Sequence, residues 1–282
     1  MHFPALLTAL FIDRVFWNAS DRRNFDWLRD YVAWWLRRSW IRPARNAHWV
    51  GLVPVLPLLL LIAWLQTGLA PAIGSLVEFA FATLVLLFSL GPRDLGRDVE
   101  QFLSAMSKGD NAEAGKLADT ISTEPADSTE SATERVRDGL LIAICHRYIG
   151  PVFWFAILGP VGAAAYRLAE QVRRLLNSQP SIGSSNDRLF PLLNWIPVRL
   201  TAAGFAIAGN FDAVAAAWKH CSQNESECPR DSDLLLATGR AALENHHAHG
   251  SAEDIEDAMA LGWRNLTLWV AIVGVASLLS IL

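Results

Sequence analysis

Two apolar runs separated by three residues place the tightest limit on how this chain can fold. Residues 49–65, "WVGLVPVLPLLLLIAWL", carry no charge, and residues 69–90, "LAPAIGSLVEFAFATLVLLFSL", carry only Glu78. Each run is close to the roughly 20 residues that a helix needs to cross the core of a bilayer. With only "QTG" between them, the two runs predict a membrane helical hairpin.

The composition favours a membrane protein over a soluble globular one. Of the 282 residues, 52% are hydrophobic and 18% are charged, whereas soluble domains have about 25% charged residues. Ahead of the first apolar run, eight arginines outnumber four aspartates, and such an excess marks the cytoplasmic side of a bilayer. We therefore predict an all-α fold: a polytopic helical membrane protein with cytoplasmic helical segments, embedded in the lipid bilayer of a bacterial inner (cytoplasmic) membrane.

Hydropathy, proline and charge divide the chain further. The tryptophans and arginines of the first 48 residues are typical of helices at the lipid–water boundary, although a buried aromatic stripe has the same periodicity. Gly150-Pro151 and Gly159-Pro160 interrupt a later apolar run, which fits either a broken or re-entrant segment or an ordinary kinked span. The crossings between residues 148 and 209 stay open. The predicted segments are amphipathic interfacial helices at 1–48, a transmembrane hairpin at 49–90, cytoplasmic helices and an acidic flexible loop at 91–135, broken or re-entrant membrane segments at 136–212, a cytoplasmic helical region at 213–262 and a terminal transmembrane helix at 263–282.

The three cysteines do not form a zinc-type CxxC pattern, so they predict no metal site. Cys221 and Cys228 would stay reduced in a cytoplasmic loop, and they could pair only on an exported side. At residues 109–111, "GDN", an aspartate and an asparagine are good caps for the helix that follows.

The sequence carries no Walker, GxGxxG, HExxH or GxSxG motif, so we predict no catalytic residue, no metal and no cofactor. The histidines of "ENHHAHG" at 244–250 could bind a metal, but histidines at a helix end are more often solvent-exposed. No nucleic-acid partner is indicated.

Charged and polar side chains in apolar surroundings are the better site candidates, because burying them is unfavourable unless a partner or ligand compensates. Arginines among them could clamp a phosphate or carboxylate group. The alternative is that they reach the lipid headgroups or form structural pairs, such as Arg199 with Asp138 or Asp13. Read by itself, Arg199 follows a helix start near Pro197. The candidate ligand-binding residues are Asp13, Arg14, Glu134, Asp138, Arg147, Tyr166, Arg167, Asn194 and Arg199.

The order of several motifs resembles the AmpE family along essentially the whole chain. The matching stretches are "FIDRVF", "GDNAEAGKLA", "GPVFWFAILGPVGAAAYRL" and "NWIPVRLTAAGFAIAGNFDAVAAAW". That resemblance implies an inner-membrane regulatory or sensory protein of β-lactamase induction that works alongside peptidoglycan recycling. It also implies a cell-wall fragment or nucleotide as ligand and a cytoplasmic protein partner. A plainer alternative is a membrane scaffold that presents its cytoplasmic helices.

"NWIPVRLTA" also resembles a stretch of the CobD/CbiB family, membrane enzymes of cobalamin synthesis that join an aminopropanol unit to cobyric acid in an ATP-dependent amide formation. This alternative implies ATP and Mg²⁺. Several motifs of those enzymes are replaced here: their early Gly-Asp-Pro region is "FIDRVFWNASDRRNF" and their Val-Gly-Arg-Asp-Thr is "ADTISTEPADSTES". A synthetase must hold ATP, metal and two substrates, so the joint loss of acidic and amide positions favours the AmpE-type regulator over an enzyme.

Overall fold

The computed structural model describes residues 2–15, 26–36, 52–69, 74–90, 95–122, 131–178, 188–224, 226, 228–243 and 252–279. Helices make up 92% of the structure and no strand occurs in these ranges. The predicted all-α class is therefore confirmed. The chain forms two compact units: unit 1 contains residues 1–92 and 150–195, and unit 2 contains residues 93–149 and 196–282.

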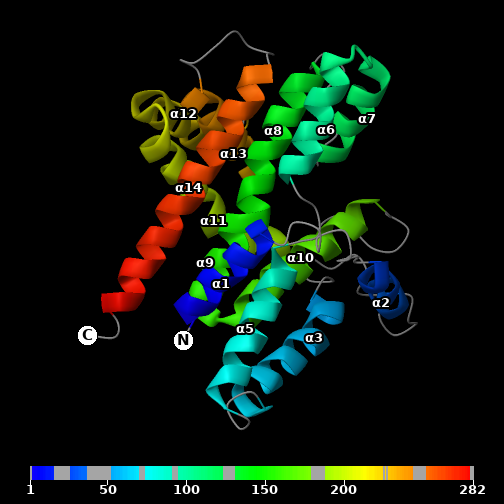
Figure 1. Ribbon diagram of the computed structural model, residues 1–282, viewed down its shortest axis with the longest axis vertical. Coiled ribbons are helices and arrows are strands. Elements are labelled where there is room, and N and C mark those ends of the chain that lie inside the picture. The colour runs from blue at the N-terminus through cyan, green and yellow to red at the C-terminus, as the bar shows by residue number, and fades with distance from the viewer. Residues whose placement is uncertain are drawn as a thin grey trace. The chain divides into compact units, whose positions relative to one another are not determined.

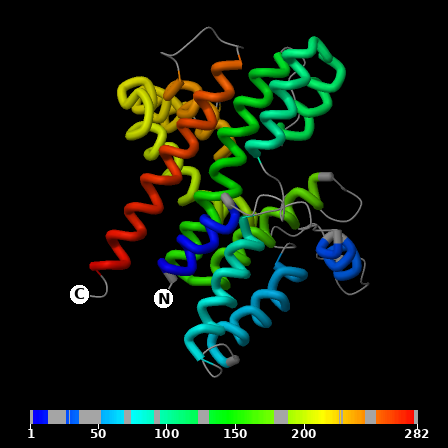
Figure 2. Tube along the Cα trace, viewed as in Figure 1, coloured from blue at the N-terminus to red at the C-terminus, as the bar shows by residue number. Residues whose placement is uncertain are grey.

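Unit 1 is built on the long helix α10, against which α3 and α5 both pack. The short π-helix η3 directly follows α3, and α5 is the next helix along the chain (Figure 2). The core of this unit includes Tyr166, Val172 and Leu176 of α10 together with Leu28 and Val32 of α2. Its elements are α1 (His2–Val15), α2 (Asp26–Leu36), α3 (Leu52–Trp64), η3 (Leu65–Leu69), α5 (Ser75–Ser89), α9 (Gly150–Leu158), α10 (Pro160–Ser178) and the first part of α11 (Leu189–Ala208).

Unit 2 is centred on α8, which packs against α7, α13 and α14 (Figure 1). Asp110 caps α7 by accepting a hydrogen bond from the Glu113 backbone N–H, as the sequence predicted. The core contains Leu141 and Cys145 of α8 and η4, Phe205 of α11 and Leu261 of α14. The elements of unit 2 are α6 (Leu95–Ser107), α7 (Asn111–Ile121), α8 (Ala132–Ile144), the π-helix η4 (Cys145–Ile149), the second part of α11, α12 (Phe211–Gln223), α13 (Asp231–Leu243) and α14 (Ala252–Leu279).

Three helical stretches of the described chain are long and apolar enough to cross a membrane: Ala132–Leu158, Leu189–Ala208 and Ala252–Leu279. Shorter apolar helices cover Phe3–Asp13, Leu52–Gly68 and Ser75–Ser89, the last two within the predicted hairpin. Apolar helices suit a lipid bilayer, because their side chains are compatible with lipid and their backbone N–H and C=O groups are paired within the helix. Which segments cross, and which face the cytoplasm, stay predictions.

Pro197 lies in the interior of α11, which begins eight residues earlier at Leu189. The interpretation that a helix starts near Pro197 is therefore wrong. A proline lacks the N–H that would bond to the carbonyl four residues before it, which here is the carbonyl of Leu193. The indole Nε1 of Trp154 donates to that carbonyl oxygen at 3.0 Å. A side chain of α9 thus replaces the missing backbone donor, and the helix continues through the proline.

Helix α14 is fixed to α11 by two side-chain hydrogen bonds. Asn265, which is fully buried, donates from Nδ2 to the carbonyl of Thr201 at 2.9 Å, and Trp269 donates from Nε1 to the carbonyl of Leu200 at 3.1 Å. Gly204 permits this approach, because a Cβ at that position would overlap the Asn265 amide. Both accepting carbonyls follow Arg199 directly, so α14 holds the part of α11 that carries this arginine.

Cys221 and Cys228 form a disulfide, with their Cα atoms 5.3 Å apart. The bond joins the end of α12 to the segment that precedes α13. The expectation of two reduced thiols did not anticipate this contact, because the six intervening residues do not reveal that the chain turns back on itself.

Candidate functional site

Tyr166 and Asn194, two of the sequence candidates, meet in the interior of unit 1. The Tyr166 hydroxyl donates to Asn194 Oδ1 at 2.7 Å, and both residues are buried. Gly150 makes room for the ring, since a Cβ at Gly150 would overlap the Tyr166 phenol. The candidate Tyr166–Asn194 pair therefore depends on the glycine of the Gly150-Pro151 pair.

Arg167, another candidate, binds Glu170 on the same helix. Arg174 also binds this carboxylate, from Nη2 to Oε1 at 2.6 Å. Only 2% of the Glu170 side chain is exposed, so two guanidinium groups compensate one buried negative charge. Sequence reasoning missed Glu170, although its spacing of three and four residues from the two arginines was a readable signal.

Asp138 is the centre of a second cluster, in unit 2. Arg137 donates from Nε to Oδ1 at 3.0 Å. Arg240 donates from Nε to the two carboxylate oxygens, at 3.2 Å and 3.1 Å, and from Nη2 to Oδ2. Sequence reasoning selected Asp138 but missed both arginines. Arg240 lies 102 residues away, so no local pattern could have connected it to Asp138.

Glu134 has a local structural role at the start of α8. Its backbone N–H donates to Ser131 Oγ at 3.2 Å, and its carboxylate accepts from the Ser131 backbone N–H at 2.9 Å. This reciprocal capping box satisfies two donors at the helix N-terminus.

Arg199 pairs with Asp231, at 3.3 Å between Nη1 and Oδ1, a partner that sequence reasoning did not name. About a third of the Arg199 side chain stays exposed, at 34%. Asp13 is partly buried in α1, and the Arg14 side chain lies outside the described residues.

Arg147 is buried in η4 and is the one charged residue between positions 139 and 158. Its guanidinium lies 5.4 Å from the centroid of the adjacent Tyr148 ring, and its Nε has no acceptor in the described part of the chain. π-Helical turns are frequent at functional sites, and here the turn directly precedes Gly150-Pro151. The structure thus keeps Arg147 as a candidate anion-binding residue.

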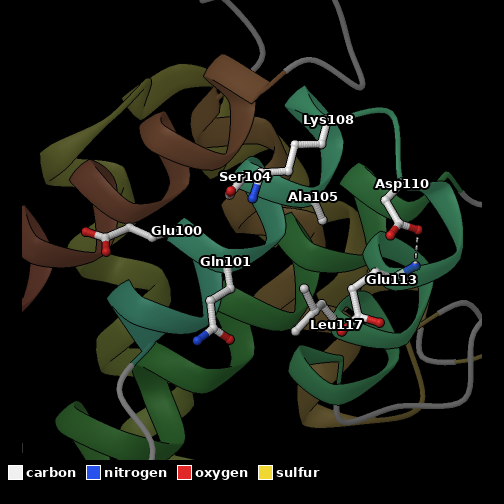
Figure 3. A pocket seen from close by; sticks show the side chains of 8 residues that line it. All are labelled: Glu100, Gln101, Ser104, Ala105, Lys108, Asp110, Glu113 and Leu117. Carbon is white, nitrogen blue, oxygen red and sulfur yellow. Dashed lines mark hydrogen bonds between the residues drawn. The ribbon is translucent and has the colours of Figure 1, made fainter.

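A surface groove of about 420 Å³ lies along α6 and α7 (Figure 3). Figure 3 shows Lys108 and Asp110 near the turn between the two helices, with Asp110 hydrogen-bonded to the Glu113 backbone. None of the nine sequence candidates lines this groove. Its charged side chains are exposed, so water already stabilises their charges. Their presence therefore gives no indication of a bound ligand.

The described residues bring together no group of three or more histidine, cysteine, aspartate or glutamate side chains that could hold a metal ion. The histidines of the 244–250 stretch lie outside the described residues. The donor sets that the structure does show, arginines around single carboxylates, are suited to binding oxyanions.

Comparison with known families decides between the two resemblances. The family model described as "CobD/Cbib protein" matches residues 6–232. The chain belongs to the CobD/CbiB family. All nine candidate residues lie within the matched range. Arg240 of α13 and the α14 side chains that hold α11 lie beyond it.

Curated relatives of this CobD/CbiB chain carry one name, "Cobalamin biosynthesis protein CobD". The relative from Stutzerimonas stutzeri is 26% identical over 247 residues, which is 78% of each chain. That from Chromobacterium violaceum is 25% identical, also over 78% of each chain. That from Brucella anthropi is 27% identical and covers 84% of this chain and 82% of its own. No solved structure matches the chain.

These matches correct the functional reading of the sequence. The AmpE-type interpretation, with β-lactamase induction as the function, is wrong, because the family model and the curated relatives point to CobD. That interpretation assigned the motifs shared by the two resemblances to the AmpE family and not to the CobD/CbiB family. "NWIPVRLTA", at 194–202, was the most specific signal for CobD/CbiB.

Proposed function

We propose that this chain acts in cobalamin biosynthesis, as a multi-pass protein of the bacterial inner membrane that forms an amide between a corrinoid carboxylate and an amino alcohol. The observation that carries the proposal is the family match over residues 6–232, together with relatives named as CobD over about four fifths of the chain. The cofactor and substrate expectations of that alternative, ATP with Mg²⁺, belong to the proposal.

The arginine clusters support the proposal chemically. Amide formation from a carboxylate requires loss of a carboxylate oxygen, and ATP supplies the driving force for that loss. Carboxylate and phosphate groups are bound best by guanidinium groups, which offer planar pairs of N–H donors. Arg137 and Arg147 lie on the apolar stretch Ala132–Leu158, and Arg199 lies on Leu189–Ala208. Arg147 is buried, and its Nε has no acceptor within the described residues. The described residues offer no group of three or more side chains that would hold Mg²⁺ by itself.

A genetic complementation experiment tests the proposal. The gene would be expressed in a bacterial strain that lacks its own CobD and needs cobalamin for growth. We expect growth when cobyric acid is supplied. Cobinamide, which already contains the amide, serves as the control that bypasses the step, and membrane immunoblots show that the protein is made. Growth on cobinamide but not on cobyric acid would refute the amide-forming function.

The replaced enzyme motifs give this experiment a second informative outcome. In that outcome, the chain fails to complement while cobyric acid still raises its unfolding temperature. That result would show that the ligand site has survived without its chemistry. If cobyric acid neither supports growth nor binds, the proposal fails altogether. The amount of protein in the membrane separates both results from poor expression.

A further inference from the structure

Arg137 is held in place at one end and left open at the other. Its Nε donates to Asp138, while its two terminal nitrogens donate to no group within the described residues. Only 9% of the side chain is exposed. The Nη1–Nη2 edge of a guanidinium is the edge that binds two oxygens of one anion. Arg137 therefore presents a pre-oriented pair of donors with little freedom to turn away.

The surrounding helices position this donor pair. The Ser131–Glu134 capping box fixes the first turn of α8 one turn ahead of Arg137. Gly239 brings α13 close to α8, since a Cβ there would lie 2.7 Å from Leu141 Cδ1. The next residue, Arg240, then reaches Asp138, and the Nε atoms of both arginines lie within 3.2 Å of the same Asp138 oxygen. Two guanidinium groups are thus side by side.

The location suits a ligand that arrives from water. The cluster directly precedes residues 139–158, in which Arg147 is the one charged residue. The Arg240 side chain reaches solvent, with 43% of its surface exposed. Two guanidinium groups that approach from different helices match a tetrahedral anion, which offers oxygens in several directions, better than a planar carboxylate, which fits a single fork.

We propose that Arg137 and Arg240, positioned by Asp138, bind a phosphate group at the N-terminal end of α8. Arg137 supplies the paired donors, Asp138 orients both arginines, and Arg240 adds a second positive charge at the open side. The site does not depend on the amide-forming reaction. If both hold, the phosphate group would belong to a substrate of that reaction.

A phosphate titration of the purified full-length chain tests the site. The protein would be held in phosphatidylcholine nanodiscs, and inorganic phosphate would be followed by ³¹P NMR line broadening. We expect saturable binding that Arg137→Gln weakens by at least about tenfold, since tenfold corresponds to the loss of only one of its two charge-assisted hydrogen bonds. Arg137→Lys keeps the charge without the fork and should give an intermediate affinity. Arg240→Gln should weaken binding less, because the paired donors remain.

Arg135→Gln is the matched control on the same helix. Arg135 pairs with Asp119, whose side chain is 65% exposed, so this variant removes an equal charge two residues away without touching the Arg137 donors. We expect it to bind phosphate as the unchanged protein does. Equal weakening in Arg135→Gln and Arg137→Gln, or unchanged binding in Arg137→Gln, would overturn the proposal. So would an absence of saturable binding, or a loss confined to Arg174→Gln in the Glu170 cluster.

Nanodiscs that contain phosphatidylglycerol distinguish the sources of the phosphate group. Phosphate binding that persists in them identifies a soluble phosphate compound as the ligand. Displacement of inorganic phosphate that depends on Arg137 identifies a lipid headgroup, and both results retain a phosphate site. Because the titration contains no corrinoid, its failure is independent of the complementation result.

Discussion

Buried arginines are found among the candidate residues of both units, and each has a different environment. Arg167 shares a carboxylate with Arg174 on one helix, whereas Arg137 shares Asp138 with Arg240 of another helix. Arg147 has an aromatic ring beside it and no acceptor for Nε within the described residues. Removing one partner of a buried ion pair leaves an uncompensated charge, which costs about 3–5 kcal/mol. These groups therefore constrain the fold as well as any ligand.

Gly150 gives the clearest prediction for a single residue. Gly150→Ala forces a methyl group into the Tyr166 ring, and overpacking of this kind costs about 1–3 kcal/mol. Gly115→Ala is the matched control, because a Cβ at that helical position meets no atom within 4 Å and alanine is the better helix former by about 1 kcal/mol. We expect the first variant to lower the free energy of unfolding in detergent and the second to leave it unchanged or raise it. Equal effects would show that the Gly150–Tyr166 contact is not tight.

Most helices of this chain could be predicted from hydropathy and capping residues, but the continuation of α11 through Pro197 could not. The apolar runs and the Asp110 cap are local features, and the structure has helices where they predicted them. Pro197 was misinterpreted as a helix start because a proline in a sequence gives no sign of a distant donor. The indole that donates to the Leu193 carbonyl belongs to Trp154, 39 residues before Leu193. Whether the helix continues through Pro197 therefore depends on tertiary structure.

Trp154 and Pro197 should therefore be energetically coupled. In the unchanged chain, Trp154→Phe removes the donor to the Leu193 carbonyl, and leaving such a group without a partner costs about 1–3 kcal/mol. In a Pro197→Ala background, the restored backbone N–H of residue 197 can reach that carbonyl, so the same substitution should cost less. Unfolding free energies of the four proteins, measured by circular dichroism in mixed micelles, give the coupling. Equal costs in both backgrounds would contradict this account of Pro197.

Unit 2 continues past residue 232, where the family-model match ends. Arg240, Asn265 and Trp269 follow residue 232, yet the first binds Asp138 and the other two hold α11. The sequence could select Asp138 and Arg199 as charges in apolar surroundings, because each interrupts an apolar pattern. It could not supply their partners, because these come from helices that approach only in the folded chain. The candidate site was therefore predictable as single residues and not as clusters.

The redox state of Cys221 and Cys228 tests on which side of the membrane the α12–α13 region lies. ATP is a cytosolic nucleotide, so the proposed function places the α12–α13 region in a compartment where thiols are kept reduced. We expect both cysteines to be thiols in growing cells and to form the bond only on oxidation.

Trapping with N-ethylmaleimide in intact cells, followed by mass spectrometry, measures their state. Cys145 is buried and should react only after denaturation, which makes it the internal control. Adducts on Cys221 and Cys228 without prior reduction would agree with a cytoplasmic location. An intact disulfide in the trapped sample would place α12 on the oxidising side. Since α12 packs on α13, which carries Arg240 to Asp138, the Asp138 cluster would then lie away from cytosolic ATP, and the proposed reaction could not use it there.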